Sequence, residues 1–181
     1  MKFAIFFILI SFSHVSFAEK TNLISGNYSI YNINTGTLAY VADKKYDSYV
    51  YSLPAYYVDK YASEITDLEK ANWIIKESSY GSGRYTLKNK YSGLCLTFYG
   101  IGYQTTQTGC SNQNENQQWN IVQNTTNKGG FSMVASSDDS VCLYSWPGDT
   151  DYYMYTDACA TYKNLSDWTF ITTITRGYYN P

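Results

Sequence analysis

The side chains best suited to chemistry in this sequence are four cysteines, and histidine is almost absent beside them. These cysteines are Cys95, Cys110, Cys142 and Cys159. An even number of cysteines in an exported chain indicates disulfides. A zinc site is the alternative, but no two of the cysteines form a CxxC pair, which many zinc sites contain. We therefore expect disulfides, no metal ion and no cofactor.

Histidine, the usual general base of hydrolases, occurs once, as His14 near the start of the chain. If that segment is removed, Ser-His-Asp and Cys-His catalysis are both excluded. Pairs of carboxylates, as in glycosidases, remain possible. The acidic residues are scattered, however, and fall in no motif. We expect a binding protein rather than an enzyme.

Residues 1–18 have the layout of a secretory signal peptide. Lys2 supplies the positive start, residues 3–12 are mostly apolar, and Ser16-Phe17-Ala18 is a small-x-small cleavage site. We expect cleavage after Ala18, secretion, and a single mature domain over residues 19–181. No second long apolar run follows, so an integral membrane protein is not expected. The formal net charge of −2 argues against nucleic acid as a partner, because phosphate binding usually leaves a basic footprint.

The elements that must position the cysteines follow a pattern that occurs three times. Each copy opens on a glycine followed by alternating residues and closes on a tryptophan with apolar neighbours. The copies cover about residues 26–76, 83–123 and 129–174, and their tryptophans are Trp73, Trp119 and Trp168. A period of this size predicts similar units around one core. The short alternating runs predict strands, and hence an all-β, barrel-like domain.

The repeat selects one of the three pairings that four cysteines allow. Cys95 and Cys110 lie in the second copy, and Cys142 and Cys159 lie in the third. We therefore predict two disulfides, each within a copy. The first copy is longer, and its residues 63–71 begin with an N-cap candidate and acidic residues, which predicts a short helix.

The aromatic residues are unusually many, with 21 tyrosines and 4 tryptophans. The three repeated tryptophans are predicted to lie in the core, whereas a fourth stands outside the repeat beside a Pro-Gly turn. The candidates for ligand contact in this region are Tyr144, Trp146, Tyr152 and Tyr153. Tyr and Trp pair a flat apolar face with a polar tip, which suits sugar rings and protein interfaces. These residues are either an exposed binding patch near loops or tyrosines used as strand formers.

The second copy resembles a ricin-B-type β-trefoil repeat. The residues that carry this resemblance are SGLCL at 92–96, the spaced Cys110, and Asn116-Gln117-Gln118-Trp119, which matches the family's NQxW ending. The resemblance covers roughly residues 26–174 and implies a β-trefoil that binds sugar. The family's Asp after the first cysteine is replaced here by Thr97, and by Tyr40 and Tyr144 in the other copies. The implied ligand-binding candidates of the second copy are Thr97, Tyr103 as the stacking ring, Asn116 and Gln117. For Asn116 and Gln117 the alternative is hydrogen bonding to the trefoil backbone.

A narrower resemblance is to the binding subunits A and C of cytolethal distending toxins, with the C subunit favoured. It rests on layout, namely residues 31–36, the acidic helical stretch before Trp73, and disulfides confined to the later copies. This resemblance implies a delivery role, in which the trefoil binds a host cell-surface glycan or lipid. It also implies partner subunits, a nuclease-like toxic subunit and a second trefoil. The alternative is a non-lectin subunit, a scaffold or inhibitor that binds a protein partner, and a hydrolase is a third possibility.

Overall fold

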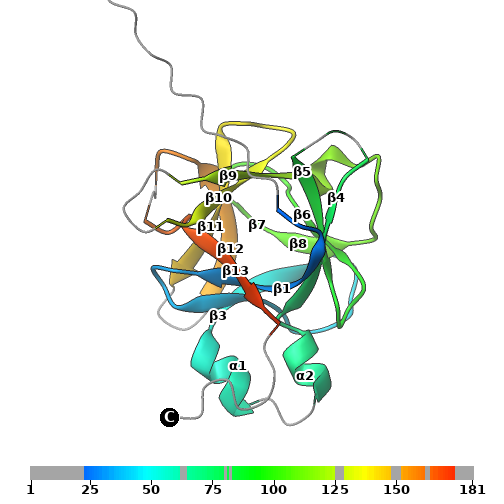
Figure 1. Ribbon diagram of the computed structural model, residues 1–181, viewed down its shortest axis with the longest axis vertical. Helices are drawn as coiled ribbons and strands as arrows, with labels where there is room; N and C mark the ends of the chain where they lie inside the picture. Colours follow the sequence, from blue (N-terminus) through cyan, green and yellow to red (C-terminus); the bar gives the residue numbers. More distant parts are fainter. Residues whose placement is uncertain are drawn as a thin grey trace, which may run out of the picture.

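The computed structural model describes residues 23–61, 65–79, 81, 83–124, 129–147, 152–161 and 164–173. The predicted signal peptide, residues 1–18, and the C-terminal residues 174–181 lie outside the described residues. The described chain is mostly strand with short helices, so the all-β prediction is confirmed. Figure 1 shows the strands wrapped around one interior, with the helices outside it.

A closed ring of antiparallel strands forms the barrel. Its strands are β1 (Gly26–Asn32), β4 (Asn72–Glu77), β5 (Arg84–Asn89), β9 (Trp119–Gln123), β10 (Phe131–Ala135) and β13 (Trp168–Thr172). In that order each strand pairs with the next, and β13 pairs back with β1. Because the ring closes, these strands leave no unpaired edge.

The remaining strands form hairpins that project from the barrel. They are β2 (Thr37–Val41) with β3 (Ser48–Pro54), β6 (Cys95–Thr97) with β8 (Thr106–Thr108), and β11 (Val141–Pro147) with β12 (Tyr152–Ala158). The short strand β7 (Tyr103–Gln104) precedes β8, and the 3-10 helix η1 (Glu115–Gln117) precedes β9. Apart from β7, which pairs with β12, the barrel and the hairpins account for every strand of the described chain.

The three repeated tryptophans lie at the centre of the core, as predicted. Trp73, Trp119 and Trp168 are fully buried in one cluster of apolar side chains. Each indole N–H donates to a backbone carbonyl of a hairpin strand, Trp73 to Ala39 at 3.0 Å. The other two acceptors are the carbonyls of Leu96, at 3.3 Å, and Leu143, at 2.9 Å. Each tryptophan thus packs in the core, and its hydrogen bond links a hairpin to the barrel. The same bond gives the buried indole N–H an acceptor.

The predicted disulfides are confirmed. Cys95 bonds Cys110 and Cys142 bonds Cys159, with Cα–Cα distances of 5.1 and 4.8 Å. The described chain contains no free cysteine. Each bond closes a short loop at the base of a hairpin, which stabilises the fold by restricting the unfolded chain.

Two short helices lie side by side at one end of the molecule (Figure 1). They are α1 (Ala55–Tyr61) and α2 (Ile65–Glu69). The helix predicted over residues 63–71 is therefore confirmed as α2, whereas its proposed N-cap, Ser63, lies outside the described residues. Helix α1 was not predicted. It is fixed by a small apolar cluster in which Val58 packs with Leu68 and Leu38.

None of the helices in the described ranges is long and apolar enough to cross a membrane.

Candidate ligand-binding face

The hairpins meet one another on the side of the barrel from which they project. Strand β3 pairs with β8, placing Tyr49 opposite Thr106. Strand β12 pairs with β3 through Tyr153 and Tyr51, and with β7 through Tyr155 and Gln104. Segments far apart in the sequence are thereby joined into one surface, which we call the hairpin face.

A row of aromatic rings crosses this face, and we call it the aromatic track. Trp146 lies opposite Tyr153 in the β11–β12 ladder. The ring of Tyr153 lies 5.8 Å from that of Tyr51 on the neighbouring hairpin. Met154, next to Tyr153, is fully buried, because alternate residues of a strand point to opposite sides. The track is exposed at its end, where Trp146 retains 38% of its accessible surface.

Beside the track lies a cavity of about 400 Å³, the tyrosine pocket. Its aromatic lining consists of Tyr49, Tyr99, Tyr103 and Tyr155, and its one charged lining residue is Asp47. Tyr103 is the most exposed of these rings, at 63%, and Tyr49 and Tyr99 are each 51% exposed. The volume falls within the range of small-molecule sites in proteins, roughly 300–1,000 Å³.

Asp47 is held in a fixed position at the start of β3. Its backbone is left-handed, with φ 63°, a conformation that aspartate tolerates better than most residues. Its N–H donates to the carbonyl of Gln107 at 2.8 Å. The Tyr99 hydroxyl and the Thr106 hydroxyl both donate to Oδ1, at 2.9 and 3.1 Å. The other carboxylate oxygen, Oδ2, accepts no hydrogen bond from the described residues, so it can receive a ligand.

The lining of the pocket contains one carboxylate, that of Asp47, and four tyrosine side chains. Partial burial, and then the hydrogen bond to the carboxylate of Asp47, raise the pKa of Tyr99 above its usual value. Tyr99 therefore remains a hydrogen-bond donor to Asp47 throughout the physiological range. The pocket lining contains no second carboxylate, so it has no acid–base pair of the glycosidase type.

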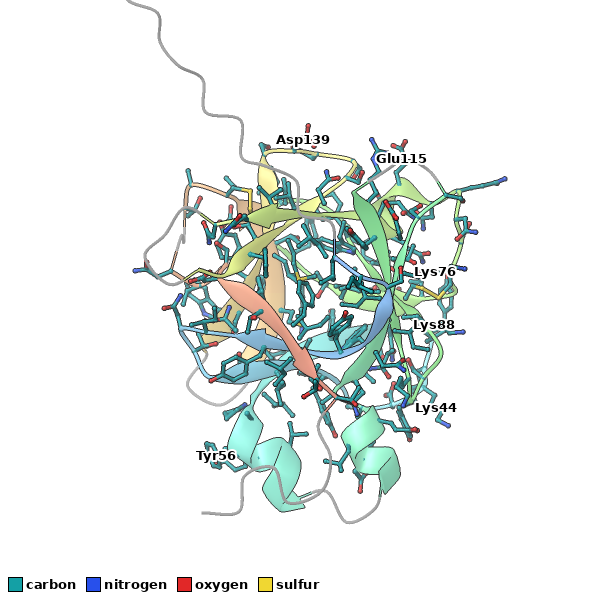
Figure 2. All side chains as sticks on the ribbon, in the orientation of Figure 1. Lys44, Tyr56, Lys76, Lys88, Glu115 and Asp139 are labelled. Carbon is teal, nitrogen blue, oxygen red and sulfur yellow. A yellow bond between two sulfur atoms is a disulfide. The ribbon has the colours of Figure 1, made fainter. Side chains whose placement is uncertain are left out.

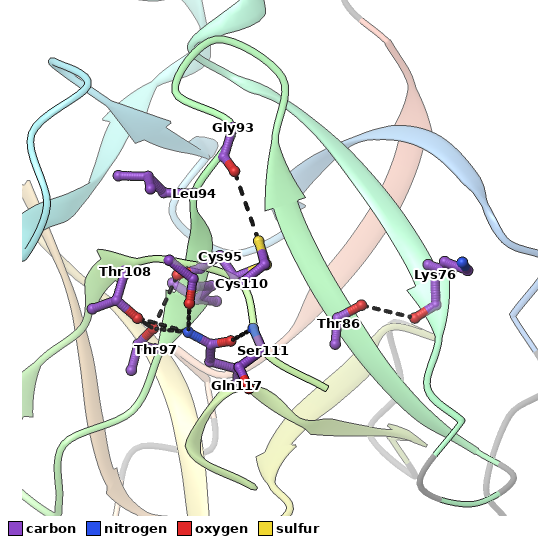
Figure 3. The surroundings of a disulfide bond; sticks show 12 residues. Lys76, Thr86, Gly93, Leu94, Cys95, Thr97, Thr108, Cys110, Ser111 and Gln117 are labelled. Atoms are coloured by element: carbon purple, nitrogen blue, oxygen red, sulfur yellow. Dashed lines mark hydrogen bonds between the residues drawn. A yellow bond between two sulfur atoms is a disulfide. The ribbon is translucent and has the colours of Figure 1, made fainter. Parts of the chain in front are cut away.

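The second-copy candidates Thr97 and Gln117 form part of the framework of the fold (Figure 3). Gln117 is fully buried, and its Nε2 donates to Thr108 Oγ1 at 2.6 Å and to the carbonyl of Gly109 at 2.8 Å. Its Oε1 accepts from the backbone N–H of Ser111 at 2.8 Å. Thr97 is also buried, 2.7 Å from Thr108 Oγ1 and 3.3 Å from Gln117 Nε2. The backbone hydrogen bonding considered as the alternative for Gln117 is present, and ligand contact by either residue stays a prediction.

The other predicted residues are divided between the surface and the interior. Tyr103 lines the pocket and Trp146 and Tyr153 form the track, whereas Asn116 is exposed on η1. Tyr144 is buried, and its hydroxyl donates to the carbonyl of Ala158 at 2.7 Å. Tyr152 lies in β12, but its side chain is outside the described residues. Tyr144, Trp146, Tyr152 and Tyr153 all lie in strands β11 and β12 rather than in loops. Part of this aromatic set is therefore strand-forming, which was one of the two interpretations of the sequence.

Sequence reasoning missed Asp47, Tyr49, Tyr99 and Tyr155 as members of one site. The high tyrosine content of residues 46–61 was a visible signal, but it did not indicate which hairpins would meet. No group of three or more His, Cys, Asp or Glu side chains could hold a metal ion within the described ranges. The face therefore offers a row of aromatic side chains and, in the pocket lining, the carboxylate of Asp47, which are groups suited to binding a ligand.

Comparison with known proteins gives the same fold. Residues 69–152 match the family model described as ricin-type beta-trefoil lectin domain-like. A chain of the Haemophilus ducreyi cytolethal distending toxin is similar in structure, with a TM-score of 0.67 and 17% sequence identity. That match covers 87% of this chain and 92% of the toxin chain. The corresponding toxin from Actinobacillus actinomycetemcomitans gives a TM-score of 0.66 at 18% identity, covering 86% of this chain and 96% of that one.

A fungal lectin shares the architecture as well. The Macrolepiota procera ricin B-like lectin, solved in complex with lactose, has a TM-score of 0.62 and 17% identity, covering 84% of this chain and 99% of the lectin. No curated protein matches the chain by sequence. Identities this low show a shared fold alone, and that fold is the β-trefoil of ricin-type lectins.

Proposed function

We propose that this ricin-B-type lectin-like β-trefoil is a secreted carbohydrate-binding subunit that attaches a toxin assembly to the host cell surface. The family match and the likeness to toxin and lectin chains support a binding role of this kind. The delivery role, the C-subunit-like identity, and the two partners, a nuclease-like subunit and a second trefoil, belong to the proposal. So does export through a signal peptide at residues 1–18.

The proposal includes three structural repeats, at about residues 26–76, 83–123 and 129–174. Its support is the recurring contact of Trp73, Trp119 and Trp168 with a hairpin carbonyl. Ligand contact is assigned to what differs between the repeats, chiefly the aromatic residues of the hairpins.

The observation that carries the function is the aromatic track. Sugar rings present apolar C–H faces that stack on flat aromatic side chains, while the polar tips of Tyr and Trp reach sugar hydroxyls. Trp146, Tyr153 and Tyr51 offer such surfaces in a continuous row. A row rather than a deep cavity suits an extended oligosaccharide.

The test is a glycan array with the purified mature protein and its Trp146→Ala variant. Wild type should bind a subset of glycans, and Trp146→Ala should lose that binding with its melting temperature nearly unchanged, because Trp146 is partly exposed. Trp146→Phe should retain part of the signal, since a stacking ring remains. Tyr56→Ala is the matched control, because Tyr56 is an exposed aromatic side chain on α1 (Figure 2) and is not part of the aromatic track.

A protein-interaction role is the second candidate, and one observation favours it. The rings of Tyr56 and Tyr57 stack at 4.3 Å on α1 and are exposed, outside the hairpin face. Aromatic residues are enriched at protein interfaces. If the wild-type protein bound no glycan and no cells but co-purified tightly with a partner in a Tyr56-dependent way, the lectin proposal would be rejected.

A further inference from the structure

We propose that the tyrosine pocket binds a quaternary ammonium group, supplied by the choline headgroups of a phosphatidylcholine bilayer. This inference goes beyond the sugar-binding role of the aromatic track, which uses other side chains of the hairpin face. It assigns a second class of cell-surface ligand to the same side of the molecule.

The charge of the pocket suits a cation. Its lining contains the carboxylate of Asp47 and no lysine, arginine or histidine. The rings of Tyr49, Tyr99 and Tyr103 surround the same space. The face of an aromatic ring attracts cations, and quaternary ammonium groups are the ligands for which proteins use several rings together. A carboxylate at the same site adds direct Coulombic attraction.

Several donors of the pocket are already used within the protein, and its charge favours an ammonium group over a neutral hexose. The hydroxyl protons of Tyr99 and Thr106 are both committed to Asp47 Oδ1. The N–H of Gly102 donates to the carbonyl of Thr156 at 2.7 Å, and Nε2 of Gln104 has no hydrogen-bond partner in the described chain but is buried away from solvent. A hexose could pair with Asp47 Oδ2 and with the phenols of the lining, but it is neutral and gains no Coulombic attraction from the carboxylate, whereas an ammonium group does. A trimethylammonium group needs no hydrogen bonds at all.

The rest of a choline headgroup also fits. A cavity of about 400 Å³ exceeds the volume of a trimethylammonium group and leaves room for the phosphate that follows it. The phenols of Tyr49, Tyr103 and Tyr155 make no hydrogen bond within the described chain. A phenol donates readily to a phosphate oxygen. Tyr103 is the most exposed ring of the lining, so its phenol is the one most open to solvent and to an incoming headgroup.

The surroundings of the pocket suit a bilayer rather than a soluble choline compound. Tyr46 precedes Asp47 and is 70% exposed, and Ile101 lies between Tyr99 and Tyr103 and is 51% exposed. Exposed tyrosine and apolar side chains are typical of the headgroup region of membranes. Because the pocket lining is acidic, it disfavours anionic lipids and favours zwitterionic choline lipids.

Calorimetric titration with phosphocholine tests the ligand class. Wild type should bind phosphocholine saturably, and it should bind choline at least about tenfold more tightly than 3,3-dimethyl-1-butanol, the neutral isostere of choline. Asp47→Asn should weaken phosphocholine binding by about tenfold or more while keeping an oxygen for Tyr99 and Thr106. Tyr103→Ala should also weaken it, Tyr103→Phe should retain most of it, and Tyr56→Ala should match wild type.

Vesicle co-sedimentation tests the source. The protein should bind phosphatidylcholine vesicles and not phosphatidylglycerol vesicles, and phosphocholine should displace it. Equal affinity for choline and its neutral isostere, an unaffected Asp47→Asn variant, or no binding by a correctly melting wild type would overturn the proposal. Binding of phosphocholine without binding of vesicles would reject the bilayer as its source. Saturable binding of lactose that depends on Asp47 would assign the pocket to sugar instead. Loss of glycan binding in Trp146→Ala reports separately on the proposed function.

Discussion

Replacing Gln117 by glutamate should destabilise the fold strongly at neutral pH and much less in acid. The two side chains have the same shape, but an ionised carboxylate has no proton to donate. In the native fold Gln117 Nε2 donates to Thr108 Oγ1 at 2.6 Å and to the carbonyl of Gly109 at 2.8 Å (Figure 3). The hydroxyl of Thr108 can turn and donate to the new carboxylate. The carbonyl of Gly109 cannot, so two acceptors would face each other.

The magnitude follows from these contacts. Leaving the carbonyl of Gly109 without its donor costs about 1–3 kcal/mol. Gln117 is fully buried, so burial and the facing carbonyl raise the pKa of the substituted carboxyl group, and each unit of elevation costs about 1.4 kcal/mol at neutral pH. We expect a loss of about 3–5 kcal/mol at pH 7. The free-energy cost of a carboxyl group whose pKa is raised by folding is absent below its unfolded pKa and grows as pH rises to its folded pKa. The stability of Gln117→Glu should therefore be regained as pH falls toward about 4.

The assay is urea denaturation of Gln117→Glu at pH 7 and pH 4, followed by tryptophan fluorescence. Asn116→Asp is the matched control, because it makes the same change of charge one residue away on an exposed side chain. It should change the free energy of unfolding by less than about 0.5 kcal/mol at either pH. If Gln117→Glu behaved like Asn116→Asp, with no gain on acidification, Gln117 would not be part of the buried framework.

Three further perturbations test the core. Trp119→Ala should cost about 3–5 kcal/mol or prevent folding, because it empties the centre of the barrel; urea midpoints measure this, and a small loss would contradict the core assignment. Burial raises the pKa of Tyr85, so its contribution to stability should be full below its unfolded pKa of about 10 and lost as pH rises through its folded value; melts and absorbance at 295 nm should show this, with a smaller alkaline decline in Tyr85→Phe. Gly130→Ala would drive a methyl group into the buried carboxylate of Asp167 and should cost about 1–3 kcal/mol, whereas Gly109→Ala meets only an ordinary contact.

The framework could be predicted from the sequence where its determinants repeat. Trp73, Trp119 and Trp168 sit in similar apolar settings, and burial of all three follows from that pattern. The disulfide pairing follows as well, because each pair lies within one copy. Helix α1 could not be predicted, since its tyrosine-rich sequence has no helical period and it is fixed by packing of Val58 against Leu68.

The site was less predictable, because its contacts join distant segments. Asp47 receives hydrogen bonds from Tyr99 and Thr106, which lie 52 and 59 residues further along the chain. No local spacing indicates such partners. Thr97 and Gln117 differ from Asp47, because the sequence did point to them. They were predicted as ligand contacts from a sugar-binding motif, and both are buried in the structure. A polar residue beside a predicted pocket can equally well satisfy the backbone that shapes it.

The first hairpin has no disulfide, and its apolar cluster accounts for its stability without one. The residue before each tryptophan-bound carbonyl is Leu38, Cys95 or Cys142. The two cysteines are cross-linked, and each cross-link is worth about 3 kcal/mol. Leu38 is instead fully buried with Ala55 and residues of both helices, and burying one leucine is worth about 1.5–3 kcal/mol. The helices therefore supply by apolar burial what the disulfides supply covalently. Reduction should loosen the second and third hairpins while leaving the pairing of β2 with β3 in place, and the hydrogen bonds of Asp47 to Tyr99 and Thr106 should weaken with the second hairpin.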